Sequence, residues 1–151
     1  MTAPADGAAR DLYHPLILEH CRRPRNFRVP AGARRIRADN PLCGDQIDVY
    51  LDIAGGTVRD IAFDGVGCAV ARASASLMTE AIMGRGLPYG RRLLDAFRRL
   101  VESPEGAPDD PDLGELAVFA DLRHFPARRQ CALLAWNALD EAVREPGADT
   151  A

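Results

Sequence analysis

The stretch NPLCGD, residues 40–45, places a thiol two positions before a carboxylate. Buried structural cysteines usually lie among aliphatic residues, where they behave as small apolar side chains. Cys43 is instead followed by glycine, and the proline and glycine of this stretch predict a tight turn. A thiol on a turn beside an acid indicates metal binding or reactive-thiol chemistry.

Two further cysteines are expected at the starts of helices. Cys68 joins a predicted strand to a helix, and Cys131 opens the last predicted helix. The free N–H groups and the dipole of a helix start favour an anion, so both thiols are expected in the first turn as available thiolates. Gly44 directly follows Cys43. Gly67 directly precedes Cys68, so both thiols have a neighbour without a side chain, which lets a metal or a partner approach closely.

Chain topology brings part of this set together. Residues 45–53 run away from the turn, Gly55 and Gly56 reverse the chain, and residues 57–65 run back, so Cys68 is expected near Cys43. Cys131 must be brought in by tertiary packing. Three thiolates and the Asp45 carboxylate suit tetrahedral zinc or an iron–sulfur cluster. Since a carboxylate is harder and more easily displaced than a fourth Cys or His, Asp45 favours a site that exchanges something.

Each of these residues also has a structural interpretation. Cys43, Cys68 or Cys131 taken singly fits a packed thiol, and Asp45 alone fits a turn former that bonds the backbone. Taken together, they favour metal or persulfide chemistry. Cys21, in EHCRRP, lies away from any turn and is interpreted as packed or incidental. Surface or packing roles are also assigned to the three histidines, His14, His20 and His124.

Length and charge narrow the class of protein. The 151 residues fit one domain, 1–151, that can bury a core without a disulfide or a metal. The net charge of −3 gives no reason to expect nucleic acid as a partner. All 19 basic residues are arginines, which excludes a lysine Schiff base. The basic segment from Arg22 to Arg37 fits either a solvated face or a docking surface for an acidic partner.

The chain shows no targeting or membrane signal. Its beginning, MTAPADGAARD, lacks the apolar core of a signal peptide, and no run approaches 18 apolar residues. We therefore expect a cytoplasmic protein with no membrane partner. In that reducing setting, cysteines serve as metal ligands or reactive thiols rather than as disulfides.

The predicted elements are a helix, three strands and then several helices. Residues 12–21 predict a helix, and ARRIRAD, QIDVYLDI and TVRDIAFDGV predict antiparallel strands. Helices are expected from about Cys68 to Met83, in PYGRRLLDAFRRLVES and from about Ala127 to Glu145, and a short helix plus turn in DLGELAVFADLRHF. SPEGAPDDPDLG predicts an exposed loop. Residues 1–10 and 146–151 are expected to be disordered. This order predicts an α+β fold, a small three-stranded antiparallel sheet covered by helices on one face.

With these motifs assembled, the chain resembles the iron–sulfur cluster assembly scaffolds of the IscU/NifU N-terminal-domain superfamily, and most closely its SufU branch. The resemblance runs from LYHPLILEHCRRPRN to CALLAWNAL. Its most specific parts are NPLCGD, GVGCAVARASASLMTEAIMG and RRQCALLAW. It implies a SufE/IscU-like α+β fold with a metal site near one end of the sheet. The family's motif ligands fall on Cys43, Asp45, Cys68 and Cys131.

Two features favour the SufU branch over the scaffold branch. The interval between Cys68 and Cys131 contains an additional segment around GLPYGRRLLDAFRRLVESPEGAPDDPD, and such an insertion marks the SufU branch. The scaffold branch carries a histidine just before its third cysteine, where this chain has Gln130. Arg128 stands where that branch has a basic residue, and we assign it, with Gly44 and Gly67, a supporting role.

The resemblance implies a zinc-dependent sulfurtransferase that accepts persulfide sulfur from a SufS-like cysteine desulfurase and passes it to downstream iron–sulfur assembly proteins. Such a chain works as the partner of a desulfurase rather than as a stand-alone enzyme. The hypothesis is that Cys43 leaves the zinc and attacks the persulfide, while Asp45, Cys68 and Cys131 keep the metal. Two alternatives stay open: a scaffold on which an iron–sulfur cluster is assembled and transferred to apo-proteins, and a structural zinc module.

Overall fold

Alternating apolar residues build a three-stranded antiparallel sheet in the computed structural model, which describes residues 14–103 and 110–144. The strands are β1 (Arg34–Asn40), β2 (Asp45–Ala54) and β3 (Thr57–Val66), paired in the order β1-β2-β3. In β2, the fully buried Ile47 and Val49 face the helices, as their period of two requires. The expected disordered ends, 1–10 and 146–151, lie outside the described residues.

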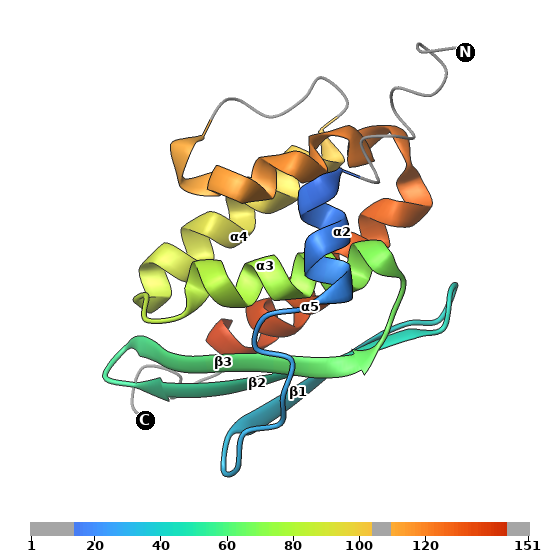
Figure 1. Cartoon of the computed structure of the whole chain (residues 1–151). Coiled ribbons are helices and arrows are strands. Elements are labelled where there is room, and N and C mark those ends of the chain that lie inside the picture. Colours follow the sequence, from blue (N-terminus) through green and yellow to red (C-terminus); the bar gives the residue numbers. More distant parts are fainter. Residues whose placement is uncertain (1–13, 104–109, 145–151) are drawn as a thin grey trace, which may run out of the picture.

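The helical elements of the described residues all lie on one side of the sheet (Figure 1). They are α2 (Pro15–Arg22), α3 (Ala69–Ile82), α4 (Leu87–Glu102), the 3-10 element η1 (Pro111–His124) and α5 (Pro126–Arg144). α3 packs on β3, and α5 packs on β1 and β2, while α2 packs on α3, and α4 and η1 pack on each other. This arrangement confirms the predicted α+β fold with helices on one face of the sheet.

A polar contact inside the core ties α5 to α3. Trp136 of α5 is fully buried and stacks on Phe97, with 4.7 Å between the ring centroids. Its indole N–H donates to the Ser74 hydroxyl of α3 at 3.1 Å, and that hydroxyl donates to the Ala132 carbonyl at 2.6 Å. Every polar atom in this chain of contacts has a partner, so it specifies how the two helices pack.

The sheet face opposite the helices is polar. Arg37 donates to both carboxylate oxygens of Asp48, at 2.8 and 3.1 Å, and the Tyr50 hydroxyl donates to Asp64 at 3.0 Å. The basic segment 22–37 is therefore partly neutralised within the chain, and Arg28, which pairs with Asp60 at 2.7 Å, adds to this.

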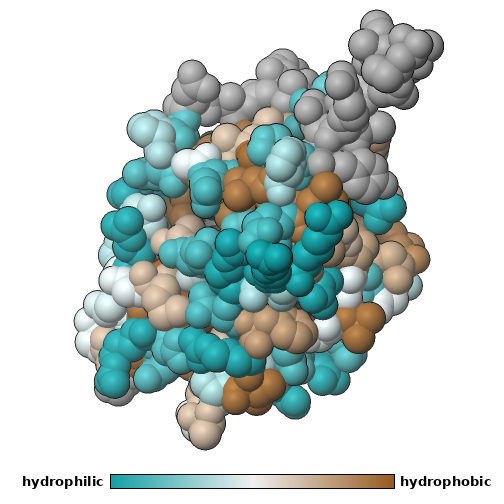
Figure 2. Space-filling view, in the orientation of Figure 1, coloured by the Kyte–Doolittle hydropathy of each residue, from teal (hydrophilic) through white to brown (hydrophobic). Residues whose placement is uncertain are grey.

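Hydrophilic residues dominate the surface seen in Figure 2, with apolar residues scattered among them. In the part of the chain that the structure describes, no helix is both long and apolar enough to cross a membrane.

Two predicted boundaries differ from the structure. The expected loop SPEGAPDDPDLG is partly outside the described residues, at 104–109, but its last residues already belong to η1. Asp110 caps this element by accepting a hydrogen bond from the Asp112 N–H at 3.0 Å, and the buried Leu113 anchors it. The last helix, predicted from about Ala127, begins one residue earlier at Pro126, because the fixed φ of proline suits the first helical position.

Candidate metal centre

The NPLCGD stretch forms the hairpin turn between β1 and β2. Asn40 ends β1 and pairs with Asp45, which begins β2. The Asn40 carbonyl accepts hydrogen bonds from the N–H groups of Cys43 and Gly44, at 3.2 and 2.8 Å. Gly44 has a φ of +75°, which glycine adopts without strain. The turn leaves Cys43 exposed, whereas the Asp45 carboxyl points to the buried, helix-covered side and is 7% exposed.

Cys131 reaches this turn from α5. Its Sγ lies 3.9 Å from the Sγ of Cys43, and its side chain is 2% exposed. Together with Asp45, these residues offer one donor atom each, and the three atoms all lie within 4.8 Å of one another. The structure therefore brings together three of the four ligands proposed from the sequence. One of them is Cys131, which reaches the site through tertiary packing.

Cys68 borders the same group. It is the N-cap residue of α3, directly before the helix as predicted, and is half-buried. Register explains its place, because Gln46, next to Asp45, pairs with Val66 near the end of the hairpin. Cys68 is not one of the three residues whose donor atoms lie within 4.8 Å of one another, but it is near enough to Cys131 to raise the pKa of that thiol.

The environment of Cys131 corrects one prediction. Because α5 starts at Pro126, Cys131 lies beyond the first turn and its Sγ contacts the Ala127 carbonyl at 3.6 Å. The helix dipole therefore does not activate it. Burial raises the pKa of the Cys131 thiol, and the neighbouring Cys68 and Cys43 thiols raise it further. Cys131 holds its proton at neutral pH unless a cation binds beside it.

Arg128 supplies a positive charge at the site. It lies in the first turn of α5, and its guanidinium interacts with the Cys68 and Cys131 thiols. The nearby Cys68 thiol, when ionised, raises the pKa of Arg128. The exposed Gln130 next to Cys131 offers only a neutral amide there.

Two structural details fit a bound metal ion. The Oδ2 atom of Asp45 is buried and has no hydrogen-bond partner among the described residues. An unsatisfied buried acceptor costs about 1–3 kcal/mol, which a cation at this oxygen would offset. A Cβ added at Gly67 would lie 3.7 Å from Asp45 Cγ and 3.0 Å from Ala71 Cβ, so glycine keeps the space beside the carboxylate open. Three sulfur donors and one oxygen suit zinc or an iron–sulfur cluster.

The remaining cysteine and histidines lie elsewhere. Cys21 is half-buried in α2, and its carbonyl accepts a hydrogen bond from Arg72. His14 caps α2, where its Nδ1 accepts from the Leu16 N–H at 3.0 Å, and His124 is exposed. His20 is buried where α2 packs on α3.

Sequence reasoning missed a second group of metal-ligating side chains. His20 of α2, Glu80 of α3 and Glu115 of η1 offer donor atoms that all lie within 4.8 Å of one another. Each is an isolated residue on a different element, so no motif or spacing links them in the sequence. Only the packing of the three elements brings them together.

The chain matches one protein family and is similar to several known proteins. The family model described as the NifU-like N terminal domain matches residues 12–132. The chain is 36% identical over 133 residues to the iron–sulfur cluster assembly scaffold protein IscU of Streptococcus pyogenes serotype M1, covering 88% of this chain and 83% of that protein. It is also 36% identical over 132 residues to the zinc-dependent sulfurtransferase SufU of Bacillus subtilis, covering 87% of this chain and 89% of that protein.

A solved structure supports the architecture. The crystal structure of a nitrogen-fixing NifU-like protein (N-terminal) from Brucella abortus matches with a TM-score of 0.83 at 26% identity. The match covers 91% of this chain and 95% of the other. The sheet and its one-sided helical cover are therefore shared with a solved relative.

Proposed function

The chain belongs to the NifU-like N-terminal domain family of iron–sulfur cluster assembly proteins, and from this premise we propose that it is a zinc-dependent sulfur acceptor for a cysteine desulfurase. The observation that carries the proposal is the difference in burial within one group of ligands. Cys43 is exposed on its turn, whereas Asp45 and Cys131 are buried. Such a site can bind an ion through its buried ligands and leave one exposed thiol accessible to a partner protein.

The metal ligands in this proposal are Cys43, Asp45, Cys68 and Cys131. Zinc, when bound, would keep the thiols ionised at neutral pH without redox chemistry. Asp45 brings an otherwise unpartnered oxygen, and Cys131 is a thiol that burial keeps protonated in the absence of a cation. A cation would give the Asp45 oxygen a partner and would allow the Cys131 thiol to ionise, which supports a role for both residues as fixed ligands.

The accepting atom is the Sγ of Cys43. Its thiolate attacks the terminal sulfur of the desulfurase persulfide, and a new sulfur–sulfur bond forms on Cys43. The sulfur–sulfur bond on the desulfurase breaks, and the desulfurase cysteine leaves as a thiolate, so the transfer involves no net oxidation. Access supports this role, because Leu42 beside Cys43 is 89% exposed and an added Cβ at Gly44 would meet no atom within 4 Å.

Arg128 and the two glycines support the step. The Arg128 guanidinium lies near the Cys68 and Cys131 sulfurs, which remain at the site when Cys43 reacts. Gly44 allows the left-handed turn that presents Cys43, and Gly67 keeps the carboxylate side of the site open. The partners in this proposal are a SufS-like cysteine desulfurase and a downstream iron–sulfur assembly protein, in the cytoplasm.

A second candidate function is a scaffold for iron–sulfur cluster assembly. It is favoured by the 36% identity to the Streptococcus pyogenes IscU, which equals the identity to the Bacillus subtilis SufU. The same three cysteines would be cluster ligands. Gln130 weighs against it, because a neutral amide is a poorer metal donor than the imidazole that the scaffold branch carries there.

Metal analysis of protein purified without air separates the two functions. The sulfur-acceptor function predicts stoichiometric, tightly bound zinc, no visible absorbance and a faster turnover of an added SufS-like desulfurase. A brown protein with stoichiometric iron and acid-labile sulfide, and no effect on the desulfurase, would support the scaffold function and overturn the first.

A further inference from the structure

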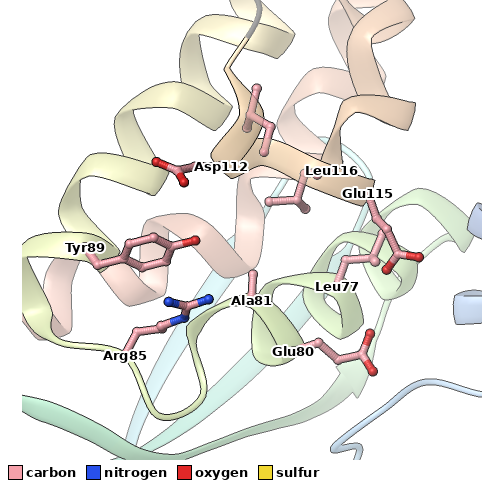
Figure 3. Close-up of a pocket in the computed structure, with 10 residues that line it drawn as sticks. Leu77, Glu80, Ala81, Arg85, Tyr89, Asp112, Glu115 and Leu116 are labelled. Carbon is pink, nitrogen blue, oxygen red and sulfur yellow. The ribbon is translucent and has the colours of Figure 1, made fainter.

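The group formed by His20, Glu80 and Glu115 lies where α2, α3 and η1 meet, apart from the cysteines. Glu80 and Glu115 line a pocket of about 240 Å³ whose floor includes Leu77 and Leu116. Figure 3 shows the two carboxylates at one side of this pocket and Arg85 at the other. The pocket connects the two carboxylates to solvent, so an ion has an entry path and room for water ligands.

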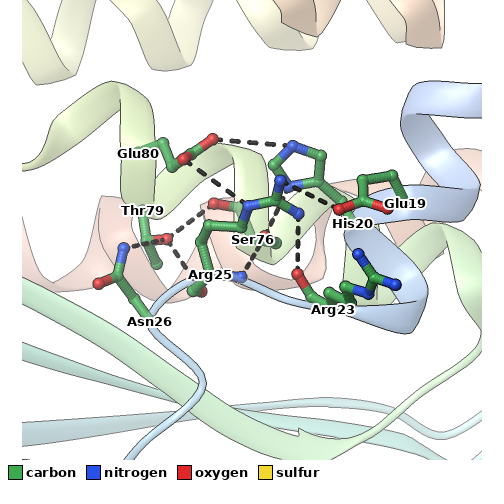
Figure 4. A network of polar contacts seen from close by, with 8 residues as sticks. All are labelled: Glu19, His20, Arg23, Arg25, Asn26, Ser76, Thr79 and Glu80. Atoms are coloured by element: carbon green, nitrogen blue, oxygen red, sulfur yellow. Dashed lines mark hydrogen bonds and ion pairs between the residues drawn. The ribbon is translucent and has the colours of Figure 1, made fainter.

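His20 is held in the orientation that a metal ligand needs. Its side chain is 2% exposed, and its Nδ1 lies 2.7 Å from the Ser76 hydroxyl oxygen (Figure 4). The same oxygen accepts a hydrogen bond from the Arg25 backbone N–H at 2.8 Å. A hydroxyl oxygen has two lone pairs and can accept from both groups. Either group can donate in the His20–Ser76 contact, depending on the imidazole tautomer. In the tautomer that carries its proton on Nδ1, Nε2 has a free lone pair, as in metal-bound histidines.

The Nε2 atom of His20 faces Glu80 without bonding to it. The distance from Nε2 to the Glu80 Oε1 is 3.7 Å, which is too long for a good hydrogen bond. Burial lowers the pKa of His20, and Arg25 lowers it further, so the imidazole is neutral at neutral pH. The pair is therefore not a charged ion pair under these conditions, and a cation between the two atoms would bind both.

Local charge also favours a cation. The charged groups that act on His20 are Arg25, Glu80, Glu115 and Glu19. Arg25 lies closest to Glu19, at 3.3 Å, and its distance to Glu80 is 4.0 Å. Among the groups that act on His20, one guanidinium thus stands against three carboxylates. A second guanidinium, that of Arg85, lies on the other side of the pocket from Glu80 and Glu115.

We propose that His20, Glu80 and Glu115 form a second metal site, which binds a divalent first-row ion of the Mn²⁺ or Fe²⁺ type. One imidazole and two carboxylates are harder donors than the thiols, so this site and the cysteine site select different ions. A bound ion joins three elements that are distant in the sequence and stabilises the seating of α2 and η1 on α3. The proposal does not depend on the function assigned to the cysteines.

Mn²⁺ is a suitable probe, because it lies at the weak end of the affinity series and avoids thiolates. Full-length protein is first loaded with zinc and then titrated with Mn²⁺, and free Mn²⁺ is measured by electron paramagnetic resonance. We expect stoichiometric binding and a higher melting temperature with Mn²⁺. Glu115→Gln should weaken binding by at least about tenfold. Glu141→Gln, which changes an exposed acid on α5, should leave it unchanged.

Pulsed resonance spectra of bound Mn²⁺ test the histidine ligand directly, since an imidazole nitrogen on the ion produces a nitrogen coupling. We expect that coupling in the wild type. Three results would overturn the proposal: no Mn²⁺ bound by the wild type, equal affinities for Glu115→Gln and Glu141→Gln, or bound Mn²⁺ without nitrogen coupling. Glu115 is exposed, so its substitution leaves folding intact and the comparison interpretable.

Discussion

The thiol of Cys43 lies 3.9 Å from the thiol of Cys131, although 88 positions separate the two residues. One sulfur is on an exposed hairpin turn and the other is buried in α5. The sheet holds the turn, and the packing of α5 against β1, β2 and α3 holds the helix, so the distance is a property of the fold. Two sulfurs this close to each other and to the Asp45 carboxyl are positioned to bind one ion.

The Asp45 carboxyl has opposite effects with and without metal. We expect Asp45→Asn to weaken zinc binding by at least about tenfold, because a neutral amide replaces the carboxylate that supplies the oxygen ligand. In metal-free protein the same change should leave the free energy of unfolding equal or higher, since a buried unpartnered oxygen is no longer charged. Zinc competition and urea unfolding of both forms measure the two effects. A less stable metal-free variant with normal zinc affinity would contradict this account.

Gly67 is expected to be needed for the space beside Asp45. Gly67→Ala places a methyl group 3.0 Å from Ala71 Cβ and 3.7 Å from Asp45 Cγ. It should lower stability by about 1–3 kcal/mol and weaken zinc binding. Gly86→Ala is a matched control, because its new methyl group makes only ordinary contacts, at 3.7 Å or more. Equal zinc affinities in the two variants would remove Gly67 from the site.

Ser74 links the core of the molecule to the position of Cys131. Ser74→Ala leaves the buried Trp136 indole N–H without its acceptor, which costs about 1–3 kcal/mol. Thermal and urea unfolding measure the loss. Since the hydroxyl also bonds the Ala132 carbonyl next to Cys131, slightly weaker zinc binding is expected as well. An unchanged unfolding free energy would show that this contact does not hold α5 in place.

The Asp48 carboxyl predicts a dependence of stability on pH. Its hydrogen bonds with Arg37 lower the pKa of Asp48 in the folded protein, so the folded state binds fewer protons than the unfolded state near pH 4. The contribution is complete above the unfolded pKa of about 4 and is lost as the pH falls through the folded value. In Asp48→Asn, the free energy of unfolding should fall less steeply as the pH drops below about 4, as measured by urea unfolding at several pH values. The same decrease in the wild type and the variant would contradict a role for Asp48 in this pH dependence.

The sheet and the ligands near it were predictable from local patterns. Alternation in β2, the Gly55-Gly56 reversal and the helical stripe of α3 led to element bounds close to those observed, and the hairpin register explains why Cys68 lies near Cys43. The reason is physical, since periodicity and turn chemistry act over a few residues and the sheet is built from consecutive strands.

Features that depend on packing were not predictable in the same way. The last helix was predicted within one residue of its observed start at Pro126, but Cys131 was expected in the first turn and lies beyond it. Its raised pKa follows from burial, which no local pattern reveals. His20, Glu80 and Glu115 come together only through the contacts of three elements.

The central claim is that the Sγ atom of Cys43 receives the sulfur from the desulfurase. The direct test incubates the zinc-loaded chain with a SufS-like cysteine desulfurase and cysteine, and then locates added sulfur by mass spectrometry without reductant. The account predicts one extra sulfur atom on the peptide that contains Cys43, none in Cys43→Ser, and full acceptance in Cys21→Ser, where a half-buried cysteine outside the site is removed. Undiminished sulfur acceptance by a folded Cys43→Ser variant would contradict it.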